Sequence, residues 1–196
     1  EMFTTGSSSG FAHLTNVDLS GQFIVFDVSA LAGQIQTFGM MVILDQIWSL
    51  VRANRDTGLR TWLYVDEFHR FFHNEYSIRT FLDIYKRARK YGLGVTGITQ
   101  NIDELLGNDQ ARLMLSNADF LLLMNQKTTD AEMLQDLLEL SDEQVRLMTT
   151  AQAGCGLLNT NGVSLGFNNR MNQRNLLAKL YSTKFGDSLP QAGGVL

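Results

Sequence analysis

Two adjacent carboxylates, Asp66 and Glu67, follow directly after the apolar stretch 61–65. An apolar run with β-branched residues between turn-forming residues is typical of a buried strand, so both side chains are expected at its C-terminal end. Ligands bind at that end in open α/β sheets, and phosphoryl transfer needs two groups there. One carboxylate holds Mg²⁺, directly or through water, and another group positions or deprotonates the nucleophile. The alternative is a structural role, because carboxylates also suit the start of a helix.

A second polar group, Thr99, Gln100 and Asn101, lies at the end of the next predicted strand, 95–99. A glutamine beside the carboxylates can sense a γ-phosphate or orient the attacking water, as it does in small GTPases. Thr99 and Gln100 are therefore candidate nucleotide-binding residues, and Gln100 is also a candidate catalytic residue. The alternative is a turn rich in hydrogen-bonding side chains.

A basic cluster, Lys86, Arg87, Arg89 and Lys90, precedes Gly92. The planar fork of arginine donates two hydrogen bonds at once to a phosphate, and such an arginine can be supplied by another subunit. Arg87 and Arg89 are therefore candidate catalytic residues. One alternative is a solvated basic helix end, which the helix dipole favours. Another is a nucleic-acid contact, which the absence of interleaved aromatic residues disfavours.

Two histidines, His69 and His73, offer a different chemistry. Their spacing would place both on one face of an α-helix, as metal ligands require, but Arg70 stands where the metalloprotease pattern needs glutamate. Residues 66–69 also have the form of a DExH helicase box, yet the other motifs of that superfamily are absent at the expected place. A packed or surface role is favoured for both histidines.

The predicted elements alternate between strands and helices, which predicts an α/β fold with a mainly parallel sheet flanked by helices. Gly58 and Gly92 are predicted helix stops, and Ser141 with Gln144 forms a predicted capping box. A C-terminal β-hairpin is predicted around residues 161–162, an Asn-Gly pair. The predicted strands are 23–28, 61–65, 95–99 and 120–124, and the predicted helices are 34–54, 75–91, 102–106, 108–116, 130–139 and 141–149.

Composition narrows the classes of protein. The chain has 196 residues, 44% of them apolar and 18% charged, as expected of a soluble globular domain. A net charge of -4 argues against a generally basic nucleic-acid coat. A single cysteine, Cys155, excludes an intramolecular disulfide and fits a reducing compartment. No apolar stretch reaches the roughly 18 residues of a membrane span, and the first residues lack the pattern of a signal peptide.

A series of short blocks runs in order along the chain: Asn16-Val17-Asp18, 23–28, 64–68, 86–92, 96–101, 116–120, Asn125-Gln126, 140–142 and 180–184. Together they resemble the C-terminal part of the VirB-four/TraC-type ATPases of conjugative type IV secretion systems. The resemblance runs from about Asn16 to Lys184. Its most specific blocks are Lys-Arg-Ala-Arg-Lys and Thr-Gly-Ile-Thr-Gln-Asn.

The resemblance implies a RecA-like P-loop NTPase fold in which Asp66 and Glu67 form the Walker B pair. Asp66 would hold the metal, Gln100 would be the downstream polar sensor, and Arg87 or Arg89 would complete the site of a neighbouring subunit. The implied cofactors are ATP and Mg²⁺. The implied partners are other copies of the chain in a homo-oligomer such as a hexamer, membrane subunits of the secretion channel, a coupling ATPase and DNA. The implied location is the cytoplasmic face of the cell membrane.

The family's phosphate-binding loop, Gly-x-x-x-x-Gly-Lys-Ser/Thr, does not occur in residues 1–196. Its amides and lysine cradle the β- and γ-phosphates, so this chain alone is expected to be inactive. Residues 1–187 are predicted to form the C-terminal part of a RecA-like ATPase domain, and residues 188–196 a flexible tail. Two other functions stay open: a DNA-pumping motor of the FtsK/HerA kind, and a non-catalytic docking or oligomerisation module.

Overall fold

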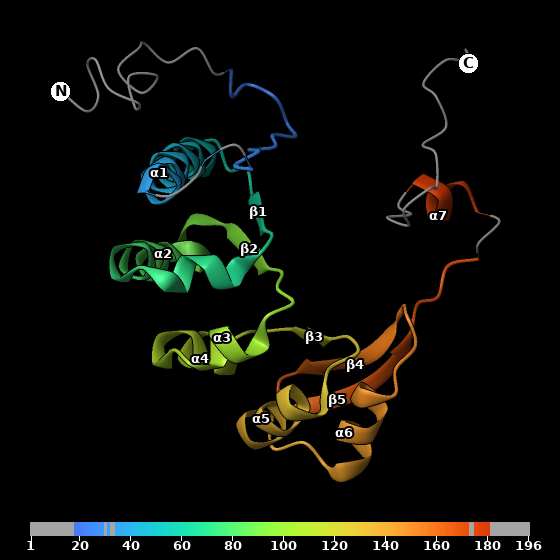
Figure 1. Cartoon of the computed structure of the whole chain (residues 1–196). Coiled ribbons are helices and arrows are strands. Elements are labelled where there is room, and N and C mark those ends of the chain that lie inside the picture. The colour runs from blue at the N-terminus through green and yellow to red at the C-terminus, as the bar shows by residue number, and fades with distance from the viewer. Residues whose placement is uncertain (1–17, 30, 32–33, 173–174, 181–196) are drawn as a thin grey trace. The chain divides into compact units, whose positions relative to one another are not determined.

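The computed structural model describes residues 18–29, 31, 34–172 and 175–180 (Figure 1). The chain divides into two compact units, with the division between Asn101 and Ile102. Each unit has its own small sheet. Within the described residues, no helix combines the length and the apolar character that crossing a membrane requires.

The first unit is a strand–helix–strand arrangement with a long helix before it (Figure 1). Strands β1 and β2 pair in parallel, with Thr61 beside Leu93 and Val65 beside Gly97. The prediction of β1 is confirmed, whereas β2 both begins and ends two residues earlier than the predicted strand 95–99. The elements are α1 (Gln34–Asp56), β1 (Thr61–Val65), η2 (Phe68–His73), α2 (Glu75–Ala88), η3 (Arg89–Tyr91) and β2 (Leu93–Gly97), where η denotes a 3₁₀ helix.

Local signals explain where these helices begin and end. The Oδ1 atom of Asn74 accepts hydrogen bonds from the backbone N–H groups of Tyr76 and Ser77, which caps the start of α2. Gly92 ends η3 with a φ of 65°, a conformation that glycine adopts without steric cost. The predicted stops at Gly58 and Gly92 are therefore confirmed, because Gly58 also has a positive φ, of 76°.

An aromatic cluster forms the core beneath the end of β1. Phe68, Phe71, Phe72 and Phe81 are all buried. The ring of Phe68 lies 5.1 Å from that of Phe72 and 5.0 Å from that of Phe81, in edge-on arrangements that aromatic rings prefer. The sequence patterns do not predict η2, which brings three of these rings together. Burial of the rings fixes the chain immediately after Asp66 and Glu67.

The predicted strand 23–28 is wrong, because this segment has no regular secondary structure. Phe23 is 87% exposed and Val25 is 73% exposed. A strand needs a neighbour to exchange backbone hydrogen bonds, and among the described residues the parallel sheet contains only β1 and β2. The backbone N–H of Ser29 instead donates to Asp27 Oδ1, 2.9 Å away, which turns the chain.

The second unit is an antiparallel sheet of order β3-β4-β5, packed with α5 and α6 (Figure 1). Its core includes Leu123, Ala131, Leu134, Met148 and Leu157, all buried. The elements are α3 (Ile102–Leu106), α4 (Asp109–Ser116), β3 (Leu121–Leu123), α5 (Thr128–Leu138), α6 (Asp142–Thr149), β4 (Cys155–Thr160), β5 (Val163–Asn168) and α7 (Leu176–Leu180).

The prediction of one mainly parallel sheet holds only in part. The fold is mixed α/β with a small parallel sheet, and β3 pairs antiparallel with β4, not with the parallel strands. Gly156 explains this pairing, since a Cβ there would lie 2.2 Å from the backbone oxygen of Leu123. The absence of a side chain at Gly156 lets the two strands approach.

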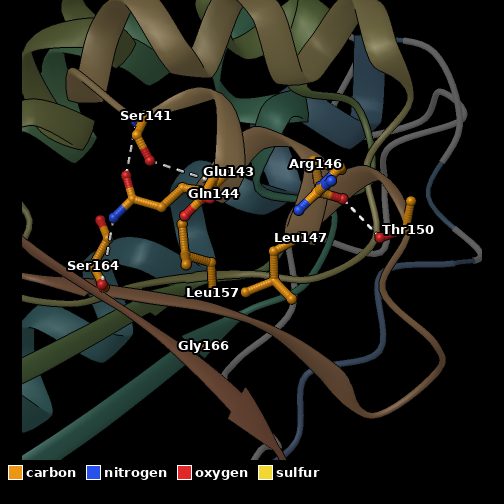
Figure 2. A pocket seen from close by; sticks show the side chains of 9 residues that line it. All are labelled: Ser141, Glu143, Gln144, Arg146, Leu147, Thr150, Leu157, Ser164 and Gly166. Carbon is orange, nitrogen blue, oxygen red and sulfur yellow. Dashed lines mark hydrogen bonds between the residues drawn. The ribbon is translucent and has the colours of Figure 1, made fainter.

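The C-terminal hairpin and the capping box are confirmed. Asn161 and Gly162 connect β4 to β5 with φ angles of 49° and 76°, as the favoured two-residue hairpin turn requires. Ser141 Oγ accepts from the backbone N–H of Gln144, and Gln144 Oε1 accepts from the backbone N–H of Ser141 (Figure 2). The predicted tail, residues 188–196, lies outside the described residues, and the predicted domain 1–187 stays a prediction.

Candidate active site

Asp66 and Glu67 lie directly after β1, at the carboxyl end of the parallel pair. Glu67 has φ 49° and ψ 45°, a left-handed conformation that is uncommon for residues other than glycine. Its backbone N–H donates to Asp66 Oδ1 at 2.9 Å. Asp66 is exposed, and the Glu67 side chain is 38% exposed. Both carboxylates therefore reach solvent at the end of the sheet where ligands of α/β proteins bind.

Backbone hydrogen bonds hold the two strand ends together beyond the sheet itself. The N–H of Ile98 donates to the carbonyl of Val65, and the N–H of Phe68 donates to the carbonyl of Ile98, both at 2.8 Å. A Cβ at Gly97 would lie 2.7 Å from ring atoms of Phe68, so the close approach of the two segments depends on glycine. The polar residues that follow β2 are thereby placed beside those that follow β1.

His69 connects the two strand ends through its side chain. It is 5% exposed. Its Nδ1 lies 3.0 Å from Thr99 Oγ1 and 3.4 Å from Glu67 Oε2, and its Nε2 lies 3.3 Å from Asn101 Nδ2. The backbone N–H of Asn101 also donates to Thr99 Oγ1, at 3.2 Å. Thr99, predicted as a binding residue, is therefore linked to the predicted catalytic Glu67 through a histidine.

The sequence patterns favour a packed or surface role for His69 and give no role to Asn101. The sequence does carry a signal for these two residues, which is their position. His69 follows closely after the acidic pair, and Asn101 follows directly after the polar residues beyond the second strand. His69 and His73 lie on the 3₁₀ helix η2, not on the α-helix that the metal alternative assumed, and their ring centroids are 5.8 Å apart. Within the part of the chain that the structure describes, no group of three or more His, Cys, Asp or Glu side chains could hold a metal ion.

Asp66 fits the role predicted for Mg²⁺. Its carboxylate is exposed, and Oδ1 is held by the backbone N–H of Glu67. Magnesium commonly takes one or two protein carboxylates and completes its octahedron with substrate phosphates and water. Asp66 would hold the ion, and the remaining ligands would come from nucleotide and solvent. Gln100 is exposed in the loop after β2, at the same carboxyl end of the parallel strands as Asp66.

The structure does not bring Arg87 and Arg89 to this site. Both are exposed, and Arg87 pairs with Asp83 at 3.5 Å on the surface of α2. The 14 residues of α2 span about 21 Å and run from the carboxyl end of β1 back to the start of β2. The backbone N–H of Thr61, the first residue of β1, donates to the carbonyl of Gly92. The basic cluster therefore lies at the opposite end of the parallel strands.

A separate hollow of about 530 Å³ lies between α6 and the β4–β5 hairpin (Figure 2). Its lining includes Gln144, Arg146, Leu147 and Ser164. Gln144 Nε2 donates to the carbonyl of Ser164 at 3.5 Å, and Gln144 also belongs to the capping box. No predicted site residue lines this hollow.

The chain is a mixed α/β protein in which an acidic pair and polar side chains follow the carboxyl ends of two parallel strands, the edge at which ligands bind in open α/β sheets. No protein-family model matches the sequence, and neither does any curated protein. Among solved structures, VirB4 of Thermoanaerobacter pseudethanolicus matches with a TM-score of 0.73 and 26% sequence identity. The match covers 87% of this chain and 48% of that chain, so this chain spans about half the length of its structural relative. This similarity confirms the resemblance to VirB4-type ATPases that was found in the sequence.

Proposed function

We propose that this chain supplies the acidic half of the ATP-hydrolysis site of a conjugative type IV secretion motor. The motor would energise channel or pilus assembly and the transfer of DNA or protein. The supporting observation is the position of Asp66 and Glu67 at the carboxyl end of β1, in a fold similar to VirB4. In open α/β sheets, ligands bind at that end of the strands.

Each residue at the strand ends has a proposed task. Asp66 binds Mg²⁺, which when bound neutralises charge on the phosphates. Glu67 accepts a proton from the attacking water as general base. Thr99 and Gln100 contact the nucleotide, and Gln100 orients the water. These tasks are supported by the contacts of His69, whose Nδ1 lies 3.4 Å from Glu67 Oε2 and 3.0 Å from Thr99 Oγ1.

The phosphates need a further set of ligands. Residues 1–196 contain no Gly-x-x-x-x-Gly-Lys-Ser/Thr loop, and about half of the VirB4 relative lies outside the match. In this proposal the phosphate-binding loop comes from another part of the complete gene product. The chain and that part together would make one hydrolytic site.

The proposed assembly is a homo-oligomer, such as a hexamer, at the cytoplasmic face of the cell membrane. Arg87 or Arg89 would act on the nucleotide of a neighbouring subunit. Their position supports this role, since both are exposed and lie at the end of the strands opposite Glu67. Membrane subunits of the secretion channel, a coupling ATPase and DNA are the proposed partners.

The test uses the complete gene product that contains this chain. We expect Mg²⁺-dependent phosphate release that DNA does not stimulate, and loss of conjugative transfer when the gene is deleted. Stimulation of hydrolysis by DNA would instead support a DNA-pumping motor of the FtsK/HerA kind. Absence of hydrolysis, with tight nucleotide-independent binding to a channel subunit, would instead support a docking module.

A further inference from the structure

Building on the proposed ATPase function, we infer that His69 is a positioning residue that orients Glu67 and Thr99 toward the nucleotide. In this arrangement the ring carries a hydrogen on Nδ1 and accepts at Nε2. It holds the carboxylate that follows β1 and the hydroxyl that follows β2 in one fixed arrangement. His69 itself touches neither the nucleotide nor the reacting water.

Burial fixes the ring. His69 is one of two buried polar residues among the described part of the chain, the other being Ser77. It belongs to the same 3₁₀ helix as the buried rings of Phe71 and Phe72. A polar group in such a place must be hydrogen-bonded, because an unsatisfied one is costly. The contacts of both ring nitrogens are therefore structural constraints on the ring.

Two contacts agree on which ring nitrogen carries the hydrogen. A carboxylate only accepts hydrogen bonds, so a hydrogen on Nδ1 makes the 3.4 Å contact with Glu67 Oε2 favourable, and Thr99 Oγ1, at 3.0 Å, shares that hydrogen. The Asn101 amide nitrogen only donates, so the 3.3 Å contact with Nε2 requires Nε2 to accept. An imidazole ring with its hydrogen on Nδ1 and an accepting Nε2 satisfies both contacts at once.

The same arrangement directs the hydroxyl of Thr99. With the ring hydrogen on Nδ1, the Thr99 oxygen accepts from that nitrogen at 3.0 Å, and it accepts from the backbone N–H of Asn101 at 3.2 Å. With both lone pairs engaged, the hydroxyl hydrogen points away from these two donors and can donate to a phosphate oxygen. Glu67 needs such a holder, because its side chain is 38% exposed and its rotamers would otherwise be free in solvent.

Two isosteric amides separate the roles of the two ring nitrogens. In His69→Asn, the amide nitrogen can take the place of Nδ1 and still donate to Glu67 and Thr99. In His69→Gln, the longer side chain reaches the place of Nε2 and leaves Glu67 without its donor. In the complete gene product we expect His69→Gln to lower kcat roughly 10- to 100-fold with little change in KM, the loss caused by misplacing a reacting group by about 1 Å. His69→Asn should keep most of the wild-type kcat.

A purely structural role for His69 predicts a different pattern. Both variants would then lose thermal stability and activity together, or would have equal kcat values. Either result overturns the inference. A wild-type protein that releases no phosphate would instead contradict the proposed function. The role of His69 would then be tested by a second measurement, nitrogen NMR of the ring.

That second measurement needs no hydrolysis. Nitrogen NMR of this chain at about pH 8, where histidine is ordinarily neutral, reports which ring nitrogen carries the hydrogen. The chain has three histidines, so the spectrum of His69→Asn identifies the His69 signals by their loss. We expect a protonated Nδ1 and an unprotonated Nε2. The opposite tautomer would show that the ring does not donate to Glu67, and would overturn the inference.

Discussion

At the residue scale, Glu67 occupies a backbone conformation that L-residues other than asparagine and aspartate seldom adopt. Its φ of 49° and ψ of 45° are left-handed, and the chain turns there between β1 and η2. Such a conformation costs a non-glycine residue about 1–2 kcal/mol. Strain of this kind is concentrated at functional sites, where the surrounding structure enforces it.

A pair of substitutions tests whether Glu67 keeps this conformation in solution. Glu67→Gly should be more stable to urea than Glu67→Ala by about 1 kcal/mol, because alanine retains the steric cost of a left-handed residue. Glu139 has a φ of 52° and provides a matched control in the second unit, with the same order expected. If alanine is as stable as glycine at position 67 but not at 139, Glu67 does not hold the left-handed turn.

His69 also shows, at the residue scale, what the sequence could not predict. Asp66 and Glu67 were identified because an apolar strand ends in two carboxylates, which is a local pattern. The link from His69 to Thr99 and Asn101 depends on strand register, since it needs Val65 beside Gly97. No pattern within a short window carries that information.

At the element scale, the features that the sequence predicted correctly are those whose signals are local. The capping box, the Asn-Gly turn and the glycine stops each depend on a few neighbouring residues, and each is confirmed. The predicted strand 23–28 was wrong, and the predicted single parallel sheet was wrong in part. Both errors arise because strand pairing depends on residues far apart in the sequence. For β3 the deciding residue is Gly156 on another strand, whose missing side chain admits the backbone of Leu123.

The capping box allows a prediction about α6. Ser141→Ala should destabilise the second unit by about 1 kcal/mol, because the backbone N–H of Gln144 loses its acceptor at the helix start. Ser141→Asp keeps an acceptor at that position and should remain close to the wild type. Urea unfolding followed by circular dichroism measures both. An equal loss of unfolding free energy in the two variants would mean that Ser141 stabilises the unit by packing and not by capping the helix.

At the scale of the whole molecule, the chain matches about half of its VirB4 relative and lacks a phosphate-binding loop. We therefore expect residues 1–196 to bind Mg·ATP weakly or not at all, since that loop supplies most phosphate contacts in P-loop enzymes. Isothermal calorimetry on this chain and on the complete gene product makes the comparison. Low-micromolar binding by residues 1–196 alone would show that the strand-end residues suffice.

The exposed arginines give a prediction about assembly. If Arg87 or Arg89 acts on a neighbour's nucleotide, its replacement by alanine should lower hydrolysis by about three to five orders of magnitude. Stability should change by no more than about 0.5 kcal/mol, because both side chains are exposed. Mixing an arginine variant with a Glu67→Gln variant should restore part of the activity. Some interfaces between subunits then contain an intact Glu67 from one subunit and an intact arginine from the other. No recovery in subunits that demonstrably co-assemble would place the arginines outside catalysis in trans.

The central claim is that the acidic pair after β1 hydrolyses ATP, and Glu67→Gln in the complete gene product tests it most directly. The amide keeps the size of the side chain but removes the proton acceptor. We predict that nucleotide affinity is retained while phosphate release falls by about two to four orders of magnitude, the usual share of general-base catalysis. The matched control is Glu132→Gln, an exposed position on α5, which should leave both quantities unchanged. Near-normal turnover in Glu67→Gln would contradict the assignment of this site.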